Sequence, residues 1–156
     1  MSIAPIVQSV TVSLPPQRAF DIFATRMGRW WKPGMTIGAQ PHADIVIEPA
    51  PGGRWFERDA DGAETEWGKV IAWDPPERLL LAWQLDATFS YDPDFETEVE
   101  VRFEDLGNGT TRVTLEHRNL ERFGPTAQKV AESLGSGWPG LMQLYADLAR
   151  SEEKAQ

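Results

Sequence analysis

The feature that most constrains how this chain can fold is a change of hydrophobic periodicity along its length. From about residue 44 to residue 117, apolar residues largely alternate with polar ones, which is typical of β-strands with one buried face. On either side of this region, apolar residues also recur at three- and four-residue intervals, which is typical of amphipathic helices. The sequence therefore predicts a run of consecutive strands flanked by helices.

The N-terminal segment predicts a strand followed by a helix. Residues 6–14 (IVQSVTVSL) alternate as a strand does. The proline pair that follows ends the strand and opens a helix, because a proline in the first helical turn costs little. Residues 20–27 carry one apolar stripe, and Gly28 ends it. We expect residues 28–34, which include two adjacent tryptophans, to form a turn or a short second helix.

Turn-forming residues divide the middle of the chain into six predicted strands. Pro-Gly-Gly at residues 51–53, Asp-Gly at residues 61–62 and Gly-Asn-Gly at residues 107–109 mark the turns. A loop rich in acidic and aromatic side chains, residues 86–96, separates the fourth of these strands from the fifth. The predicted strands cover residues 44–48, 55–58, 66–74, 78–85, 97–106 and 111–117.

The C-terminal third predicts a long amphipathic helix. Its large apolar residues share one helical face: Leu134, Trp138, Leu141, Tyr145 and Leu148. Two glycines and a proline interrupt the segment between residues 135 and 139. We therefore expect the long helix to begin near Trp138, with an earlier short helix at residues 125–134.

These elements predict an α+β fold in a single domain over residues 1–156. An antiparallel sheet has one apolar face to bury, and the last helix carries a matching stripe. Because a twisted sheet cannot lie flush against a straight helix along its whole length, large side chains or a cavity must occupy the space between them. Seven tryptophans fit either outcome, since each large aromatic side chain buries on the order of 150–250 Å².

Charge and composition disfavour several classes of function. The formal net charge of −9 disfavours binding to nucleic acids and to anionic membranes. The chain has no cysteine and only two histidines, His42 and His117, so we expect no metal site and no cofactor. No hydrophobic run is long enough to span a membrane, and the first residues do not read as a signal peptide. We expect a cytoplasmic protein, either a monomer or a homodimer.

Five short motifs resemble those of the START-like (SRPBCC) superfamily, in the branch of homologues of the heat-shock-protein-90 ATPase activator. They are WWKP at residues 30–33, PGGRW at 51–55, GKV at 68–70 with WDPPERL at 73–79, TRVTLEH at 111–117 and GW at 137–138. The resemblance spans nearly the whole chain in the same order. It implies a helix-grip fold, in which a curved antiparallel sheet of six to seven strands wraps around a long C-terminal helix, with two short helices after the first strand.

The resemblance also implies a function for the space beneath the helix. Members of the superfamily commonly hold a hydrophobic or aromatic small molecule in a helix-capped cavity, and some use that cavity as a cyclase, dehydratase or hydrolase site. The eukaryotic co-chaperones of the branch carry an additional N-terminal domain that makes much of the chaperone contact. This chain begins directly at the first predicted strand, so a chaperone partner is possible but not favoured.

Eight residues are candidates for the wall or mouth of such a cavity. Each also has an ordinary interpretation as part of the hydrophobic core or, for one tryptophan of the adjacent pair, as a side chain packed in a surface groove. The sequence leaves both interpretations open. The candidates are Trp30, Trp31, Trp67, Trp83, His117, Trp138, Met142 and Tyr145.

The sequence points to no definite catalytic residue. His117 shares a strand face with Val113 and Leu115, and is either a hydrogen-bonded core histidine or a polar contact or general base for a ligand. Five glutamates alternate with apolar neighbours in the strands, and most of them are expected to face solvent. One that faced inward would be an acid–base candidate. These glutamates are Glu48, Glu57, Glu66, Glu98 and Glu100.

Three hypotheses for the function follow. The leading one is binding of a hydrophobic or aromatic small molecule between the sheet and the last helix. The second is a cofactor-independent enzyme that uses the same cavity for acid–base chemistry, and it requires an inward carboxylate or the His117 imidazole within reach of the substrate. The third is a protein-interaction module, a bacterial-type relative of the co-chaperone, and it requires an exposed apolar patch rather than a deep pocket.

Overall fold

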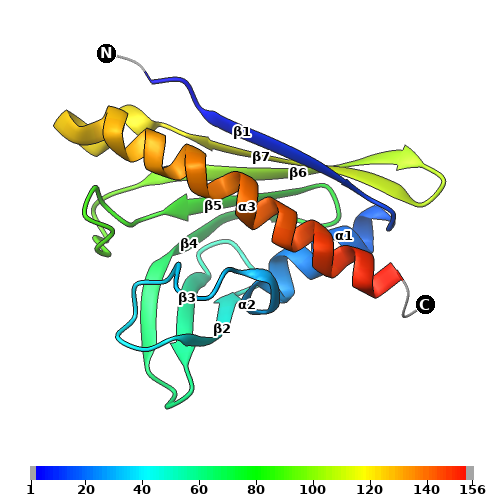
Figure 1. Cartoon of the computed structure of the whole chain (residues 1–156), viewed down its shortest axis with the longest axis horizontal. Helices are drawn as coiled ribbons and strands as arrows, with labels where there is room; N and C mark the ends of the chain where they lie inside the picture. Colours follow the sequence, from blue (N-terminus) through cyan, green and yellow to red (C-terminus); the bar gives the residue numbers. More distant parts are fainter. Residues whose placement is uncertain (1–2, 154–156) are drawn as a thin grey trace.

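A curved antiparallel sheet with a long helix lying across it makes up the protein (Figure 1). The computed structural model describes residues 3–153. Strand β1 (Ile6–Val12) leads into two short helices, α1 (Pro16–Thr25) and α2 (Met27–Trp30). The remaining elements are β2 (His42–Ile47), β3 (Arg54–Asp59), β4 (Glu64–Asp74), β5 (Arg78–Trp83), β6 (Thr97–Gly107), β7 (Thr110–Arg118), the 3-10 segment η1 (Leu120–Thr126) and α3 (Ala127–Glu153).

The strand order places the first strand beside the last one. The sheet runs β1-β7-β6-β5-β4-β3-β2, with every neighbouring pair antiparallel. Consecutive strands from β2 to β7 are therefore neighbours, and only β1 reaches its partner by a long connection. Helix α3 crosses the sheet in Figure 1, and this arrangement is the helix-grip fold that the motifs predict.

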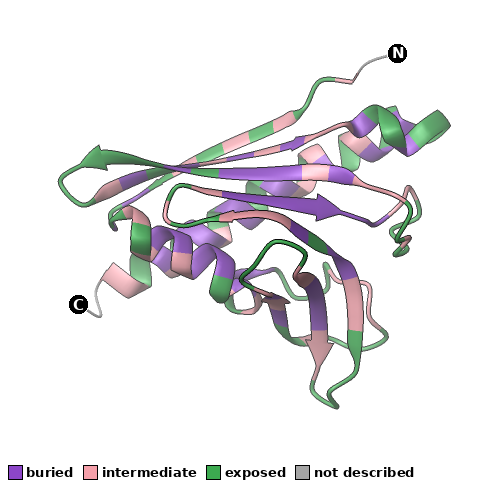
Figure 2. Cartoon of the chain, turned by 180° about the vertical axis from the view of Figure 1, so that it is seen from behind, coloured by how far each residue is buried: buried purple, intermediate pink, exposed green. Residues whose placement is uncertain are grey.

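The alternation in the strands determines which side chains face the helix. In β6 and β7, the buried residues Val101, Phe103, Val113 and Leu115 lie on one face, and their register pairs Val101 with Leu115 and Phe103 with Val113. Figure 2 shows the same pattern across the molecule, with buried residues along the central strands and exposed ones at the hairpin ends. The hydrophobic core thus lies between the inner face of the sheet and the helices.

Helix α3 is longer than the sequence predicts. We expected a separate short helix at residues 125–134 and a new start near Trp138, but one continuous helix covers the whole segment, so this prediction is wrong. Val130 and Leu134 are buried and extend the apolar stripe toward the N-terminal end of the helix. Packing of such a stripe stabilises a helix more than local propensity does, and Pro139 removes only one backbone donor.

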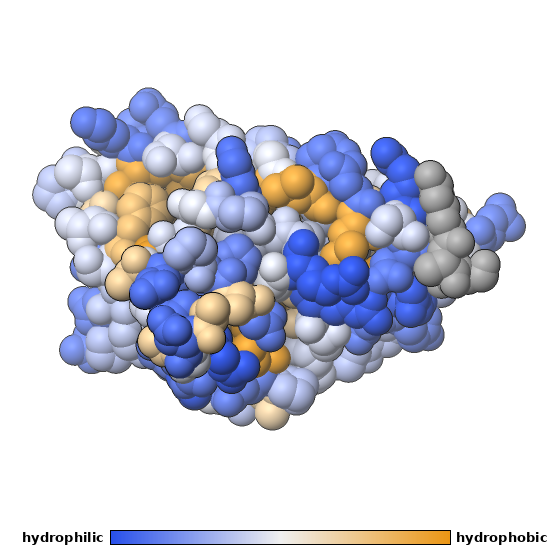
Figure 3. Space-filling model, turned by 60° about the horizontal axis from the view of Figure 1, so that its bottom comes forward, coloured by the Kyte–Doolittle hydropathy of each residue, from blue (hydrophilic) through white to orange (hydrophobic). Residues whose placement is uncertain are grey.

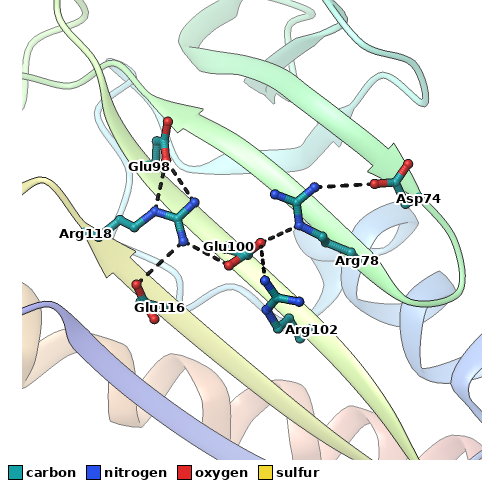
Figure 4. Close-up of polar contacts among 7 residues, drawn as sticks. All are labelled: Asp74, Arg78, Glu98, Glu100, Arg102, Glu116 and Arg118. Carbon is teal, nitrogen blue, oxygen red and sulfur yellow. Dashed lines mark hydrogen bonds and ion pairs between the residues drawn. The ribbon is translucent and has the colours of Figure 1, made fainter.

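The outer face of the sheet carries a network of ion pairs centred on Glu100 (Figure 4). The Glu100 side chain is buried, and Arg78, Arg102 and Arg118 all donate to its carboxylate, the last two at 3.1 and 2.9 Å. Burial by itself raises the pKa of Glu100, but the hydrogen bonds from Arg78 and Arg118 and the charge of Arg102 outweigh it and hold the pKa below its ordinary value. This glutamate faces away from the helix and stays ionised.

Candidate functional site

A cavity of about 250 Å³ lies between α3, the inner face of the sheet and two loops. For scale, an engineered apolar protein cavity of about 150 Å³ binds benzene. The cavity is lined mainly by large apolar side chains, and no ionisable side chain lines it. Its lining residues are Trp31, Met35, Thr36, Ile37, Trp67, Trp83, Leu85, Phe89, Ser133, Leu134, Gly137, Trp138 and Leu141.

Four indole rings form the inner part of the wall. The Trp31 ring lies 5.0 Å from that of Trp67 and 5.8 Å from that of Trp138, and the Trp83 ring lies 6.0 Å from that of Trp138, measured between ring centroids. Most of these rings meet edge to face or at a tilt, which is the favoured geometry of aromatic pairs. Rings that contact one another at such angles leave a hollow between the sheet and the helix.

The two adjacent tryptophans have different roles in packing. The Trp30 ring lies 5.0 Å from Phe23 and 5.6 Å from Tyr145, and its Nε1 donates to the carbonyl oxygen of Ile22 at 3.2 Å. Trp30 therefore anchors α2 to the core. The next residue, Trp31, lies in the cavity wall and donates from Nε1 to the carbonyl oxygen of Met35 at 2.8 Å. Trp31 thereby ties the loop over residues 32–41 to the cavity.

His117 is completely buried behind Trp138 and does not line the cavity. Trp138 Nε1 donates to His117 Nδ1 at 3.1 Å, so the imidazole proton resides on Nε2 and is donated to Thr97 Oγ1 at 2.9 Å. Both ring nitrogens are thus engaged in one neutral tautomer. Burial lowers the pKa of His117 from 6.5 to about 3, and its geometry is that of a residue positioning Trp138.

The low pKa of His117 predicts a loss of stability in mild acid. The unfolded chain takes up a proton near pH 6.5 and the folded protein only near pH 3, so the unfolded state binds more protons between these values. The contribution to the free energy of unfolding is complete above pH 6.5 and falls by about 1.4 kcal/mol per pH unit below it. Between pH 7 and pH 5, we expect His117 to account for a loss of about 2 kcal/mol in urea denaturation.

The variant His117→Asn provides the control for this effect. The carboxylates titrate in both proteins, so the difference between their pH dependences isolates the imidazole. The variant is expected to lose about 2 kcal/mol less than the natural protein between pH 7 and pH 5. Equal losses in the two proteins would contradict a buried neutral histidine.

Two further candidates from the sequence, Met142 and Tyr145, lie on α3 beyond the cavity wall. Tyr145 is fully buried, and its hydroxyl donates to the carbonyl oxygen of Ala19 at 2.8 Å, which joins α3 to α1. Burial raises the pKa of Tyr145. The Tyr145 hydroxyl is therefore committed to a contact between helices.

One carboxylate faces inward, and it is that of Glu57 on β3. Glu57 is 2% exposed, and its Oε1 accepts from Trp67 Nε1 at 2.8 Å and from the backbone N–H of Ile37 at 2.9 Å. Among residues 3–153, no lysine or arginine pairs with it. A Cβ added to Gly38 would lie 2.7 Å from Glu57 Oε2, so the loop backbone packs closely on the carboxylate. Glu57 joins the cavity wall at Trp67 to the loop at Ile37 without itself lining the cavity.

Replacing Glu57 separates its hydrogen-bonding role from its size. In Glu57→Ala the N–H groups of Trp67 and Ile37 lose their acceptor, and we expect the free energy of unfolding to fall by about 2–4 kcal/mol. Glu57→Gln keeps one acceptor oxygen and is expected to stay within about 1 kcal/mol of the natural protein. Urea denaturation measures the free energy of unfolding of both variants. Hydrogen exchange at the Ile37 amide should become faster in Glu57→Ala and stay unchanged in Glu57→Gln. Equal behaviour of the two variants would contradict this role.

Two apolar side chains border the mouth of the cavity, Met35 and Phe89, and both are exposed. Phe89 has a left-handed backbone with φ of 58°, which is unusual for an aromatic residue. Asp86 Oδ1 holds this turn by accepting from the backbone N–H groups of Thr88 at 2.9 Å and Ser90 at 3.2 Å. The turn places Phe89 in the lining of the cavity, where its side chain is also exposed to solvent.

The structure brings four of the eight residues predicted from the sequence into the cavity wall: Trp31, Trp67, Trp83 and Trp138. The other four, Trp30, His117, Met142 and Tyr145, lie in the core beside it. The sequence prediction missed the loop residues 35–37 and 89, for which no periodic signal exists, and Leu85, which continues the alternation of Leu79, Leu81 and Trp83. It also missed Leu134, Gly137 and Leu141, although these stand at helical spacing around Trp138.

The described residues hold neither a cluster of metal-ligating side chains nor a helix that could span a membrane. Residues 3–153 contain no group of three or more histidine, aspartate and glutamate side chains placed to hold a metal ion. None of the helices in that range has the length and apolar character to cross a membrane.

Comparisons with known proteins agree with the fold. The sequence matches the family described as Activator of Hsp90 ATPase homolog 1-like protein over residues 13–146. Among solved structures, it is 35% identical to an anthrahydroquino-gamma-pyrone synthase, Txn09, covering 94% of this chain and 97% of that one, with a TM-score of 0.66. It is 30% identical to CalC, a self-sacrificing resistance protein from Micromonospora echinospora, covering 96% of both chains with a TM-score of 0.72. Comparison with curated proteins gave no significant match.

Proposed function

The chain belongs to the family of Activator of Hsp90 ATPase homolog 1-like proteins, and from this premise we propose that it binds a neutral, hydrophobic or aromatic small molecule in the cavity beneath α3. The observation that carries the proposal is the cavity itself, which is walled by four indoles and several aliphatic side chains and borders no charged group. Concave, mostly apolar pockets with few polar groups are typical of small-molecule sites.

The size of the cavity limits what it can hold without rearrangement. At about 250 Å³, it falls just below the usual range for ligand pockets, about 300–1,000 Å³. A ligand of roughly ten non-hydrogen atoms fits it, on the scale of benzene in a cavity of about 150 Å³. A larger ligand requires the mouth between Met35 and Phe89 to widen, and both of these side chains are exposed.

Apolar contact alone gives weak binding. Burying on the order of 300 Å² of apolar ligand surface contributes roughly 7 kcal/mol at about 25 cal/mol per Å². Loss of translational and rotational freedom costs an estimated 4–15 kcal/mol. Useful affinity and selectivity therefore require at least one directed polar contact in addition to the indole wall.

A cyclase-like role is the second candidate, and it is favoured by the 35% identity to a synthase over nearly the full length of both chains. Two buried ionisable groups, His117 and Glu57, accept hydrogen bonds from indoles of the wall, Trp138 and Trp67, and neither group lines the cavity. Acid–base chemistry by either group would require those indoles to move. A cavity could still favour ring closure by holding a flexible substrate in a folded conformation. The 30% identity to a resistance protein supports ligand binding, the first candidate.

The exposed apolar surface gives less support to a chaperone-binding module. Within residues 3–153, the exposed large hydrophobic side chains are Val7, Met35, Phe89, Tyr91 and Leu106, and two of them belong to the cavity mouth. On the face drawn in Figure 3, hydrophobic residues form separate areas bordered by hydrophilic ones. Such scattered apolar residues are ordinary for a protein surface.

Titration with small aromatic compounds tests the proposed function. Because four tryptophans line the cavity, a bound ligand is expected to change their emission in a saturable way with one ligand per chain. Isothermal titration calorimetry gives the stoichiometry independently. A chemically broad set of one- to three-ring compounds that leaves both the emission and the heats unchanged would contradict the proposal.

A further inference from the structure

An aromatic ligand can reach the inner part of the cavity only if part of the wall moves. The four indoles of the wall line the cavity, yet each of them is at most 5% exposed. Water therefore barely reaches these rings, and an aromatic ring is wider than a water molecule. Loops commonly open to admit a ligand and close over it. The wall segment that is held least firmly is the one expected to open.

Most of the wall belongs to segments that are firmly held. Strands β4 and β5 and helix α3 supply three of the four indoles. The loop of residues 84–96 is closed on itself by its own contacts. Leu85 is buried and forms a bridge with Tyr91. Gln84 is also buried, and its backbone carbonyl accepts from the backbone N–H of Asp92 at 2.9 Å. These parts of the wall are therefore not expected to open.

The loop of residues 32–41, between α2 and β2, is held by far fewer contacts. It supplies residues 35–37 to the lining of the cavity, but none of its residues is buried. Within the described part of the chain, a single hydrogen bond joins residues 36–41 to the rest of the protein. It runs from the Ile37 N–H to Glu57 Oε1 at 2.9 Å. Few buried contacts and few hydrogen bonds are typical of a segment that opens locally.

The acceptor of that hydrogen bond is fixed in the sheet. Glu57 of β3 pairs with Thr65 of β4, and its side chain is buried. Its Oε1 also accepts from Trp67 Nε1 at 2.8 Å, so an indole of the cavity positions the atom that holds the loop. The loop packs directly on the carboxylate, since a Cβ added to Gly38 would lie 2.7 Å from Oε2. A charged acceptor makes a stronger hydrogen bond than a neutral one. Together with the half-buried Ile37 side chain, this bond keeps the loop over the cavity.

We propose that residues 32–41 are the lid of the cavity and that Glu57 is the latch that holds this lid closed. A ligand enters and leaves when the Ile37–Glu57 hydrogen bond breaks and the loop moves away from the cavity. This inference rests on the proposed function, since it names the route by which a ligand reaches the same cavity. The bond is present whether the closed cavity is empty or occupied, and it is broken during passage. It therefore controls the rates of binding and release and leaves the affinity nearly unchanged.

The first test measures both rates for 1-indanone, a neutral compound of the size that the cavity admits. Line-shape analysis of the indole N–H resonances during a titration gives the association and dissociation rates. In Glu57→Ala, both rates are expected to rise about tenfold, with a dissociation constant within about twofold of the natural one. Glu57→Gln keeps an acceptor oxygen and should bind and release at natural rates. A weaker affinity without faster association would mean that Glu57 only supports Trp67, and it would overturn the inference.

The second test locks the lid with a disulfide in Gly38→Cys/Thr65→Cys. A Cβ at Gly38 would lie 3.3 Å from Thr65 Oγ1, the position that a cysteine sulfur would take, which is within the reach of a disulfide. The natural chain has no cysteine, so no other pairing competes. The oxidised protein is expected to exchange 1-indanone more than about tenfold more slowly than the same protein after reduction. Both forms carry the same substitutions, so the comparison isolates the movement of the loop.

The outcomes distinguish the lid from the proposed function. Equally fast exchange of 1-indanone in the oxidised and reduced forms would overturn the lid and leave the proposed function standing, because the ligand still binds. A pair of cysteines that does not form the disulfide would contradict the close packing of the loop on β4. A natural protein that binds neither 1-indanone nor any compound of the broader set would count against the proposed function itself.

Discussion

Gly68→Ala is expected to lower the free energy of unfolding by more than about 4 kcal/mol, which is a large part of the stability of a domain of this size. Gly68 lies in β4, where it pairs with Trp55 of β3 and Trp83 of β5. A Cβ at this position would lie 1.9 Å from the carbonyl oxygen of Ala82. That oxygen belongs to the backbone of β5, which cannot move away without disturbing its pairing with β6.

The added Cβ would meet the ring of Trp55 only at 3.4 Å, an ordinary van der Waals contact, so the expected loss of stability comes from the clash with the β5 backbone. Thermal unfolding followed by circular dichroism should show a melting temperature at least about 10 °C lower, at roughly 2–4 °C per kcal/mol. Gly140→Ala is the control, because a Cβ there meets no heavy atom within 4 Å in the middle of α3. It should stabilise the protein by about 0.5–1 kcal/mol. A Gly68→Ala protein as stable as the natural one would contradict the tight approach of β4 to β5.

Gly137→Leu is expected to weaken binding of an aromatic ligand about fiftyfold without loss of stability. Gly137 lines the cavity, and a Cβ there would meet the terminal methyl group of Met35 at 3.1 Å. Because Met35 is flexible and exposed, it can give way, and the leucine side chain would then fill the mouth of the cavity. Excluding roughly three methylene-sized contacts from the ligand removes about 2.4 kcal/mol, at about 0.8 kcal/mol each. Leucine also favours the helix over glycine by about 1 kcal/mol.

The control for this prediction is Gly140→Leu, which adds the same side chain to the same helix where no heavy atom lies within 4 Å. In calorimetry, the affinity of Gly140→Leu for the same aromatic ligand should equal that of the natural protein. A Gly137→Leu protein that still binds with natural affinity would mean that the ligand occupies another part of the molecule.

The strands were the part of the fold that the sequence predicted best. Each of the seven predicted strands is present, and their ends differ from the prediction by at most two residues. Alternation along a strand reports burial of one face, and turns such as Gly-Asn-Gly at residues 107–109 have strong local preferences. The start of α3 was predicted wrongly because local helix breakers suggest an end there, whereas burial of Val130 and Leu134 against the rest of the core keeps the helix intact.

The cavity was only partly predictable, and the tryptophans show why. Alternation along the strands indicates that Trp67 and Trp83 face the core, and helical spacing indicates the same for Trp138. Neither pattern distinguishes a side chain in solid packing from one that borders a cavity. Four of the five lining residues on α3, Leu134, Gly137, Trp138 and Leu141, follow the spacing i, i+3, i+4, i+7. That signal was available, and it would have found three residues that the prediction omitted.

By itself, the sequence determined the order of the elements and the faces that they bury, because these follow from local periodicity and turn chemistry. Its motifs indicated the family by resemblance. Only the tertiary structure decided where along α3 the hollow lies, so that Trp138 borders it and Tyr145 bonds to α1 instead. It also decided that the indole N–H of Trp83 has no acceptor among the described residues, whereas those of Trp31, Trp67 and Trp138 do. These properties depend on the angle at which a helix crosses a twisted sheet, and no periodic pattern in one chain encodes that angle.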